Sequence, residues 1–227
     1  VATDVMEILG VRPDAIVGYS LGEAAALFST RTWKQRDDML ERMEASSLFV
    51  SDLAGTCDAA RRSWGLTDGA PVDWLVGVVD RPAATVRDAL ENYEHVYLLI
   101  VNTSDECVIG GERAAVTSFT SSLGATLVPV NGVTSVHCEV AGEVRTAYHD
   151  LHLFETTPPD GVRIYSVAAG DAHEVTRETA ALSITSQALH GFDFPAVVKK
   201  AYADGVRIFV EMGPGSVSPV FSPQARM

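Results

Sequence analysis

The stretch AIVGYSLGEAAALF, from Ala15 to Phe28, joins a short apolar run to an alanine-rich run through Gly-Tyr-Ser-Leu-Gly. The first run predicts a buried strand and the second a helix. A Gly-x-Ser-x-Gly turn between a strand and a helix is typical of a nucleophile elbow, whose small flanking residues leave the serine hydroxyl exposed. Ser20 is therefore a candidate nucleophile, and the Leu21 N–H at the helix start is a candidate oxyanion donor. An ordinary glycine-rich turn is the alternative.

The composition restricts the class of protein. The chain has 227 residues, of which 47% are hydrophobic, enough for one sizeable core. No apolar run approaches the roughly 20 residues of a membrane helix, and no signal peptide opens the sequence. The three cysteines lack metal spacing and favour a reducing, cytoplasmic compartment. The net charge of −13 argues against nucleic acid or an anionic membrane as the main ligand.

The order of the predicted elements indicates the fold class. Residues 72–130 are predicted as strand, helix, strand, strand, helix and strand, a ferredoxin-like subdomain. Residues 1–71 and 131–227 predict a hydrolase-like α/β core with a parallel sheet and helices on both faces. VRIFVEMGPG, at 206–215, is predicted as a buried strand followed by a loop. The opening residues resemble the middle of a fold, so we expect part of the core to precede them.

A serine nucleophile needs a base, and His137 is the best placed histidine. It follows a predicted strand within the loop NGVTSVHC, where catalytic residues tend to lie. His149 and His152 lie three residues apart on a predicted helix. Together with Asp150 they form a possible metal site, although a solvated helix face is the favoured interpretation.

Several motifs occur in an order that characterises one family. GYSLGE is followed by the predicted ferredoxin-like unit with VNTSDECVIGG, then by VTSVHCEVA and FVEMGPG. Over nearly its whole length the chain resembles the malonyl/acyl-CoA:acyl-carrier-protein acyltransferases, the acyltransferase domains of fatty-acid and polyketide synthases. The sequence around the elbow and AYADGVRIFVEMGPG are most similar to iterative enediyne polyketide synthases and polyunsaturated fatty-acid synthases.

The resemblance implies a role for each matching residue. Ser20 would be the nucleophile and His137 the general base and acid. A main-chain carbonyl in a segment like SQALHGFDF would orient the imidazole, with His190 as the expected contributor. Asn102 matches a recurrent asparagine near the site, although a strand-end cap explains it equally well. Tyr19 stands where the family usually has histidine.

The acyl pocket departs from the family pattern. Val136 and Ser135 are expected to line it. The arginine that would bind a malonyl carboxylate falls at Ala45, or at Glu44 with a one-residue shift. Arg42 lies on the same helix face as Ala45 and is the substitute candidate, against the alternative of a solvated helix residue. A Gly-Gln-Gly loop that would supply a second oxyanion N–H is missing from the sequence.

The resemblance implies ping-pong transfer of an acyl group, malonyl being favoured, from acyl-CoA to Ser20 and then to the phosphopantetheine thiol of an acyl carrier protein. The expected partners are that carrier domain and the neighbouring ketosynthase and linker of a multidomain synthase, and no bound cofactor or metal is expected. One alternative is a serine hydrolase or thioesterase with His173 or His190 as base. Others are a patatin-like lipase using Asp68 of TDGA and a non-catalytic carrier-docking domain.

Overall fold

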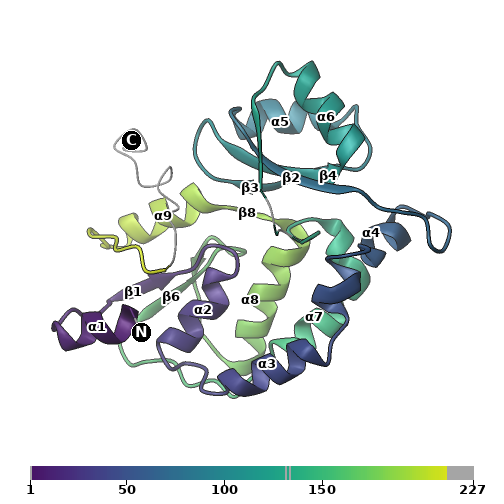
Figure 1. The fold of residues 1–227 in the computed structure, drawn as a ribbon. Helices are drawn as coiled ribbons and strands as arrows, with labels where there is room; N and C mark the ends of the chain where they lie inside the picture. Colours follow the sequence, from purple (N-terminus) through teal and green to yellow (C-terminus); the bar gives the residue numbers. More distant parts are fainter. Residues whose placement is uncertain (1, 131, 133, 214–227) are drawn as a thin grey trace.

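The structure, a computed structural model, describes residues 2–130, 132 and 134–213 and contains two sheets (Figure 1). In the smaller sheet, β1 (Ala15–Val17) pairs in parallel with β6 (Arg163–Ser166), and β6 pairs antiparallel with β7 (Asp171–Ala172). Helices α2 (Gly22–Ser29) and α9 (Phe194–Ala203) both pack against β1. The predicted α/β class is therefore confirmed, with a mixed sheet instead of a purely parallel one.

The larger sheet has the strand order β5-β2-β4-β3-β8. Its strands are β2 (Trp74–Val79), β3 (Val96–Val101), β4 (Cys107–Glu112), β5 (Leu127–Pro129) and β8 (Phe192–Asp193). Helices α5 (Ala83–Leu90) and α6 (Arg113–Ser122) pack against it. The element order from β2 to β5 is the one expected for 72–130, while the division into domains stays a prediction.

Successive residues of β2 face different clusters, as the pleat of a strand requires. Leu75 and Val79 pack in a cluster with Val86 of α5 and Phe119 of α6. Val76 belongs instead to the main core of the molecule. The larger sheet thus has two apolar faces. One packs against α5 and α6, and the other packs against the main core.

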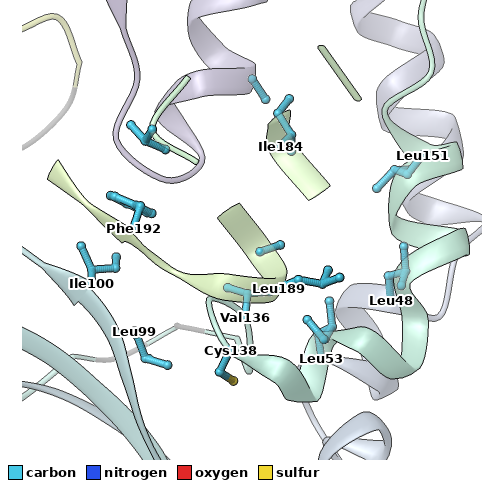
Figure 2. Close-up of a cluster of buried hydrophobic side chains, with 14 of the residues drawn as sticks. Leu48, Leu53, Leu99, Ile100, Val136, Cys138, Leu151, Ile184, Leu189 and Phe192 are labelled. Atoms are coloured by element: carbon cyan, nitrogen blue, oxygen red, sulfur yellow. The ribbon is translucent and has the colours of Figure 1, made fainter. Parts of the chain in front are cut away.

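The main core lies between β3 and a layer of helices. Figure 2 shows Leu99 and Ile100 of β3 on one side of it and Leu48, Leu53 and Leu151 on the other. These side chains come from β3, a π-helical turn with the residue after it, and a helix, and burying each one stabilises the fold by roughly 2 kcal/mol. The remaining helical segments are α1 (Ala2–Ile8), α3 (Arg36–Glu44), the π-helical turn Leu48–Asp52, α4 (Asp58–Ser63), the 3-10 segment Glu139–Val144, α7 (Arg145–Leu151) and α8 (Arg177–His190).

Helix α8 crosses this core beside α2 and α7 (Figure 1). A capping box between Thr176 and Thr179 fixes its start. It ends at Gly191, whose φ is +68°. A Cβ there would overlap the Leu99 carbonyl and lie 3.0 Å from the His137 carbonyl oxygen. Glycine at this position therefore allows β8, β3 and the His137 loop to meet.

The predicted strand at 206–215 is wrong for the part that the structure describes. Residues 206–213 form no strand, Ile208 is 82% exposed and Val210 is 54% exposed, while 214 and 215 lie outside the described residues. A buried strand needs both a pairing neighbour and apolar cover. Within the described ranges β1 pairs with β6 alone, and 206–213 adds nothing to its other edge. No helix in those ranges is long and apolar enough to cross a bilayer.

Candidate active site

Ser20 lies in the turn between β1 and α2 with φ at +52°, the left-handed conformation of a strained elbow. A Cβ on Gly18 would overlap the backbone of Glu23, so no side chain fits there. A Cβ on Gly22 would have no atom within 4 Å. The prediction that both flanking residues must be small is therefore wrong for Gly22, because only Gly18 faces the start of α2.

Ser20 Oγ lies 2.7 Å from Nε2 of His137, which is buried. The Nδ1 of His137 lies 2.9 Å from the Gln187 main-chain oxygen. Because a carbonyl only accepts, Nδ1 carries the proton and Nε2 is left to accept from the serine hydroxyl. Burial lowers the pKa of His137, partly opposed by the bond to Gln187. The imidazole is therefore neutral at pH 7, as a general base must be.

The carbonyl that orients His137 belongs to Gln187, so the prediction of His190 is wrong. Both residues lie in the last turn of α8, and the Gln187 oxygen accepts from the Gly191 N–H at 3.0 Å as well as from His137. Gln187 faces the His137 loop, and the His137 N–H donates to the neighbouring Ala188 oxygen at 2.6 Å. The His190 residue is exposed. The helix was predicted correctly, but its rotation, which decides which carbonyl faces His137, depends on tertiary packing.

Tyr19 connects the elbow to the larger sheet. Its hydroxyl donates to Asn102 Oδ1 at 2.7 Å, and Asn102 Nδ2 donates to Glu106 Oε1 at 2.9 Å. The Tyr19 ring packs edge-on against Phe192 and Phe194 at 5.4 and 5.2 Å. The Asn102 N–H also donates to the Glu106 main-chain oxygen. Both interpretations of Asn102 therefore hold at once: it lies beside the elbow and it closes the turn after β3.

The contacts of Arg42 differ from its predicted role of binding a malonyl carboxylate. Its Nη1 lies 3.4, 3.3 and 3.1 Å from the main-chain oxygens of Asp150, Leu151 and Leu153. Its guanidinium also stacks 4.1 Å from the centre of the Phe154 ring. Arg42 thus caps the C-terminal end of α7, where a cation is favoured. This removes it from the candidate acyl-binding residues, and it is not a merely solvated residue either.

A cavity of about 300 Å³ adjoins His137. It is lined by Leu90, Val96, Tyr97, Leu98, His137, Cys138, Glu139, Leu189 and His190. Lysine and arginine are absent from that lining, and so are Ser135 and Val136. Ser135 is fully buried and donates to the Leu53 carbonyl oxygen through both Oγ and N–H, while Val136 packs in the core. Neither residue lines this cavity, but Ser20 does not line it either, so their place in an acyl pocket stays a prediction.

The Leu21 N–H meets no acceptor among the described residues, although the helix N–H groups after it are engaged in the turn. The Leu21 side chain is 77% exposed, so the helix start is open to solvent. The N–H is available to a ligand, and its role as an oxyanion donor stays a prediction.

Comparisons with known proteins agree with the fold described above. No protein-family model matches the chain. A polyunsaturated fatty acid synthase polypeptide of Thraustochytrium sp. is 26% identical over 226 residues, which cover 92% of this chain and 11% of that protein. A loading acyltransferase of the avermectin polyketide synthase superposes with a TM-score of 0.74 at 18% identity, over 96% of this chain and 65% of that one.

Two further solved structures have a similar fold. The malonyl CoA-acyl carrier protein transacylase of Clostridium perfringens gives a TM-score of 0.69 at 20% identity, over 94% of this chain and 65% of that one. The acyltransferase domain of an iterative enediyne polyketide synthase gives 0.63 at 16%, over 87% and 49%. The chain has the acyltransferase-domain fold. It spans about a tenth of the synthase polypeptide that it matches, so activity and partners are treated below as proposals.

Other candidate residues have structural roles within this acyltransferase fold. His152 is buried, its Nδ1 lies 2.7 Å from the Tyr148 oxygen, and burial lowers its pKa to about 4. The predicted solvated face is therefore wrong for His152. Asp68 lies in a turn closed by the Ala70 N–H and the Thr67 oxygen. Across the described ranges no three metal-ligating side chains cluster together.

Glu23 is a site residue that the sequence reasoning missed. It is 3% exposed, in the first turn of α2, and burial raises its pKa to about 7. Its carboxylate accepts from Ser183 Oγ and, at 2.9 Å, from Gln187 Nε2. The signal was the glutamate within GYSLGE, because a charged residue next to an elbow glycine is unexpected on a buried helix face.

Proposed function

We propose that this chain is an acyltransferase domain that moves an acyl group from a CoA thioester to the phosphopantetheine thiol of an acyl carrier protein. The observation that carries the proposal is the 2.7 Å contact between Ser20 Oγ and His137 Nε2 at a strained elbow. A hydroxyl in contact with a neutral, buried imidazole is an activated nucleophile. The acyltransferase-domain fold supports the assignment.

The proposed reaction has two mirrored halves. His137 Nε2 takes the hydroxyl proton while Ser20 Oγ attacks the thioester carbon, and the Leu21 N–H stabilises the oxyanion. The C–S bond then breaks, and CoA leaves as a thiol with the proton that His137 returns. In the second half the carrier thiol gives its proton to His137, its sulfur attacks the acyl-serine, and Ser20 Oγ recovers the proton.

The resemblance favours malonyl as the acyl group, and malonyl-CoA is therefore the first donor to test. The cavity beside His137 has no cationic side chain in its lining and contains Glu139. Arg42 is bound to the carbonyls at the end of α7. Neither Arg42 nor the lining of this cavity, which does not include Ser20, offers a malonyl carboxylate a cation, so neutral acetyl and longer acyl thioesters are the competing donors.

The proposed partners are an acyl carrier protein domain and the adjoining ketosynthase and linker of a larger synthase. The similarity to one segment of a much longer synthase polypeptide supports this placement.

The test is the intact mass of the chain after incubation with malonyl-CoA, acetyl-CoA and longer acyl-CoAs, with Ser20→Ala as control. An acyl adduct on the wild type that Ser20→Ala lacks is expected. Loss of thioester without an adduct would indicate a hydrolase instead. Neither adduct nor turnover would indicate a docking domain.

A further inference from the structure

The Glu23 carboxylate is a buried charged group that the proposed reaction leaves without a role. Its donors come from two elements: the Ser183 hydroxyl and the Gln187 amide on α8, and the backbone of Val167 after β6. A buried carboxylate is tolerated only when such donors surround it. Glu23 is therefore bonded at once to the helix that orients His137 and to the smaller sheet.

Gln187 contacts both members of the Ser20–His137 pair. Its main-chain oxygen accepts from His137 Nδ1 at 2.9 Å. Its side-chain Nε2 lies 2.9 Å from Glu23 Oε2 and 3.4 Å from the Ser20 main-chain oxygen. The other amide atom, Oε1, is buried and has no partner among the described residues. The amide is therefore held through Nε2, and Glu23 is its stronger acceptor because a carboxylate is charged.

A chain of hydroxyl groups fixes the carboxylate on its other side. Ser183 Oγ lies 2.5 Å from Ser166 Oγ, which accepts from the Ala169 N–H at 3.1 Å. Each hydroxyl has one proton, so while Glu23 is ionised Ser183 donates to Glu23 and Ser166 donates to Ser183. The carboxylate is thus anchored to the end of β6 and has little freedom to move.

We propose that Glu23 is a positioning residue of the Ser20–His137 pair, which acts through Gln187 to fix the last turn of α8, and with it the imidazole, relative to the elbow. This inference rests on the proposed function of Ser20 as nucleophile. A positioned general base contributes about 10²- to 10⁴-fold to a rate. Loss of the Glu23–Gln187 bond misaligns the base without removing it, so we expect a decrease of about 10- to 100-fold.

The state of Glu23 adds a readout that a purely structural role would lack. The groups that contact the carboxylate, Ser183 and Gln187 from α8 and Val167 after β6, are all neutral, and His137 lies beyond Gln187. Burial raises the pKa of Glu23 to about 7. Protonation removes the negative charge that strengthens the bond from Gln187 Nε2, so the reactivity of Ser20 should fall as the pH decreases through 7.

The experiment measures how fast a fluorophosphonate labels Ser20, which does not depend on the acyl substrate. Ser20 Oγ attacks phosphorus, the P–F bond breaks, fluoride leaves and His137 takes the proton. Labelling is followed by intact mass between about pH 6 and 8.5 for the wild type, Glu23→Gln and Gln187→Met, with thermal unfolding alongside. Glu178→Gln is the matched control, because Glu178 lies on α8, the helix of Gln187, and its side chain is exposed.

The inference predicts labelling about 10- to 100-fold slower at pH 8 in Gln187→Met, a smaller decrease in Glu23→Gln, whose neutral amide oxygen is a weaker acceptor, and unchanged labelling in Glu178→Gln. The labelling rate of the wild type should decrease as the pH falls through 7, and the rate of Glu23→Gln should not show this decrease. Should Glu23→Gln fail to fold, Gln187→Met carries the test, since it keeps the main-chain carbonyl. A folded Glu23→Gln with the wild-type rate and pH profile would overturn the inference alone. An unlabelled wild type would overturn the nucleophile and the inference together. A labelled wild type that no acyl-CoA acylates would overturn only the transfer reaction.

Discussion

Gly18 lies against the backbone of Glu23 so closely that a Cβ would overlap the Glu23 Cα and N atoms. This contact brings the start of α2 back over the end of β1 and sets the sharpness of the turn at Ser20. The same contact places the Glu23 side chain beneath the elbow, among its donors on α8.

Gly18→Ala should destabilise the fold, because the clash is with backbone and no side chain can move to relieve it. We expect a loss of at least about 3 kcal/mol in the free energy of unfolding, the upper range for overpacking. Urea unfolding measures it. Gly22→Ala is the matched control: its Cβ meets no atom, and alanine favours the helix that begins there, so stability should be unchanged or slightly higher. Equal losses in the two variants would contradict this account of the turn.

Arg42→Ala should destabilise the chain by about 1–2 kcal/mol, since it removes a charged cap from the end of α7 and a stack on Phe154. Arg36→Ala is the control, because that side chain on the same helix is 84% exposed. The ratio of malonyl adduct to acetyl adduct, measured by intact mass, should be the same in both variants as in the wild type. A selective loss of malonyl acylation in Arg42→Ala would restore Arg42 to the acyl site.

The hydrogen bond between Tyr19 and Asn102 joins the elbow to the larger sheet and should couple the two residues energetically. Tyr19→Phe keeps the ring contacts with Phe192 and Phe194 and removes only the hydroxyl. A double-mutant cycle of Tyr19→Phe with Asn102→Ala should give a coupling free energy of about 1 kcal/mol in urea unfolding. If the losses in free energy of unfolding were additive, the contact between Tyr19 and Asn102 would not couple the elbow to the larger sheet.

Burial of His152 should make stability depend on pH. Its pKa falls from 6.5 when unfolded to about 4 when folded. A group with a depressed folded pKa stabilises the fold above the unfolded pKa, and that contribution is lost as the pH falls from 6.5 towards 4. Between pH 7.5 and 5.5 the loss is on the order of 1 kcal/mol.

His152→Asn keeps a donor for the Tyr148 oxygen. Its free energy of unfolding, measured with urea, should lack this part of the decrease at low pH. His149→Asn, at the partly exposed neighbouring histidine, is the control. Glu23 acts in the opposite direction in the same window, because its raised pKa favours the fold at low pH, so the difference between variants isolates His152. Identical pH profiles for wild type and His152→Asn would refute the assignment.

The sequence predicted those parts of the site that depend on motif and order. Ser20 follows from a local pattern, and His137 from its place after the ferredoxin-like unit. Gln187 was missed because the rotation of α8, which decides which carbonyl faces His137, depends on packing across the core. Arg42 was misplaced because helical spacing gives a face but not what lies opposite it. The strand expected at 206–215 is wrong for 206–213, because an apolar stretch does not by itself supply a neighbour to pair with.

The central claim is that Ser20 carries an acyl group from one thiol to another. The most direct measurement is the intact mass of the acylated chain before and after a pantetheine thiol is added, with the fate of the acyl group followed by chromatography. The account predicts an adduct in the wild type, none in Ser20→Ala, very little in His137→Ala, and recovery of the acyl group as its pantetheine thioester. Release of the acyl group as free acid, at a rate that the thiol does not change, would contradict it.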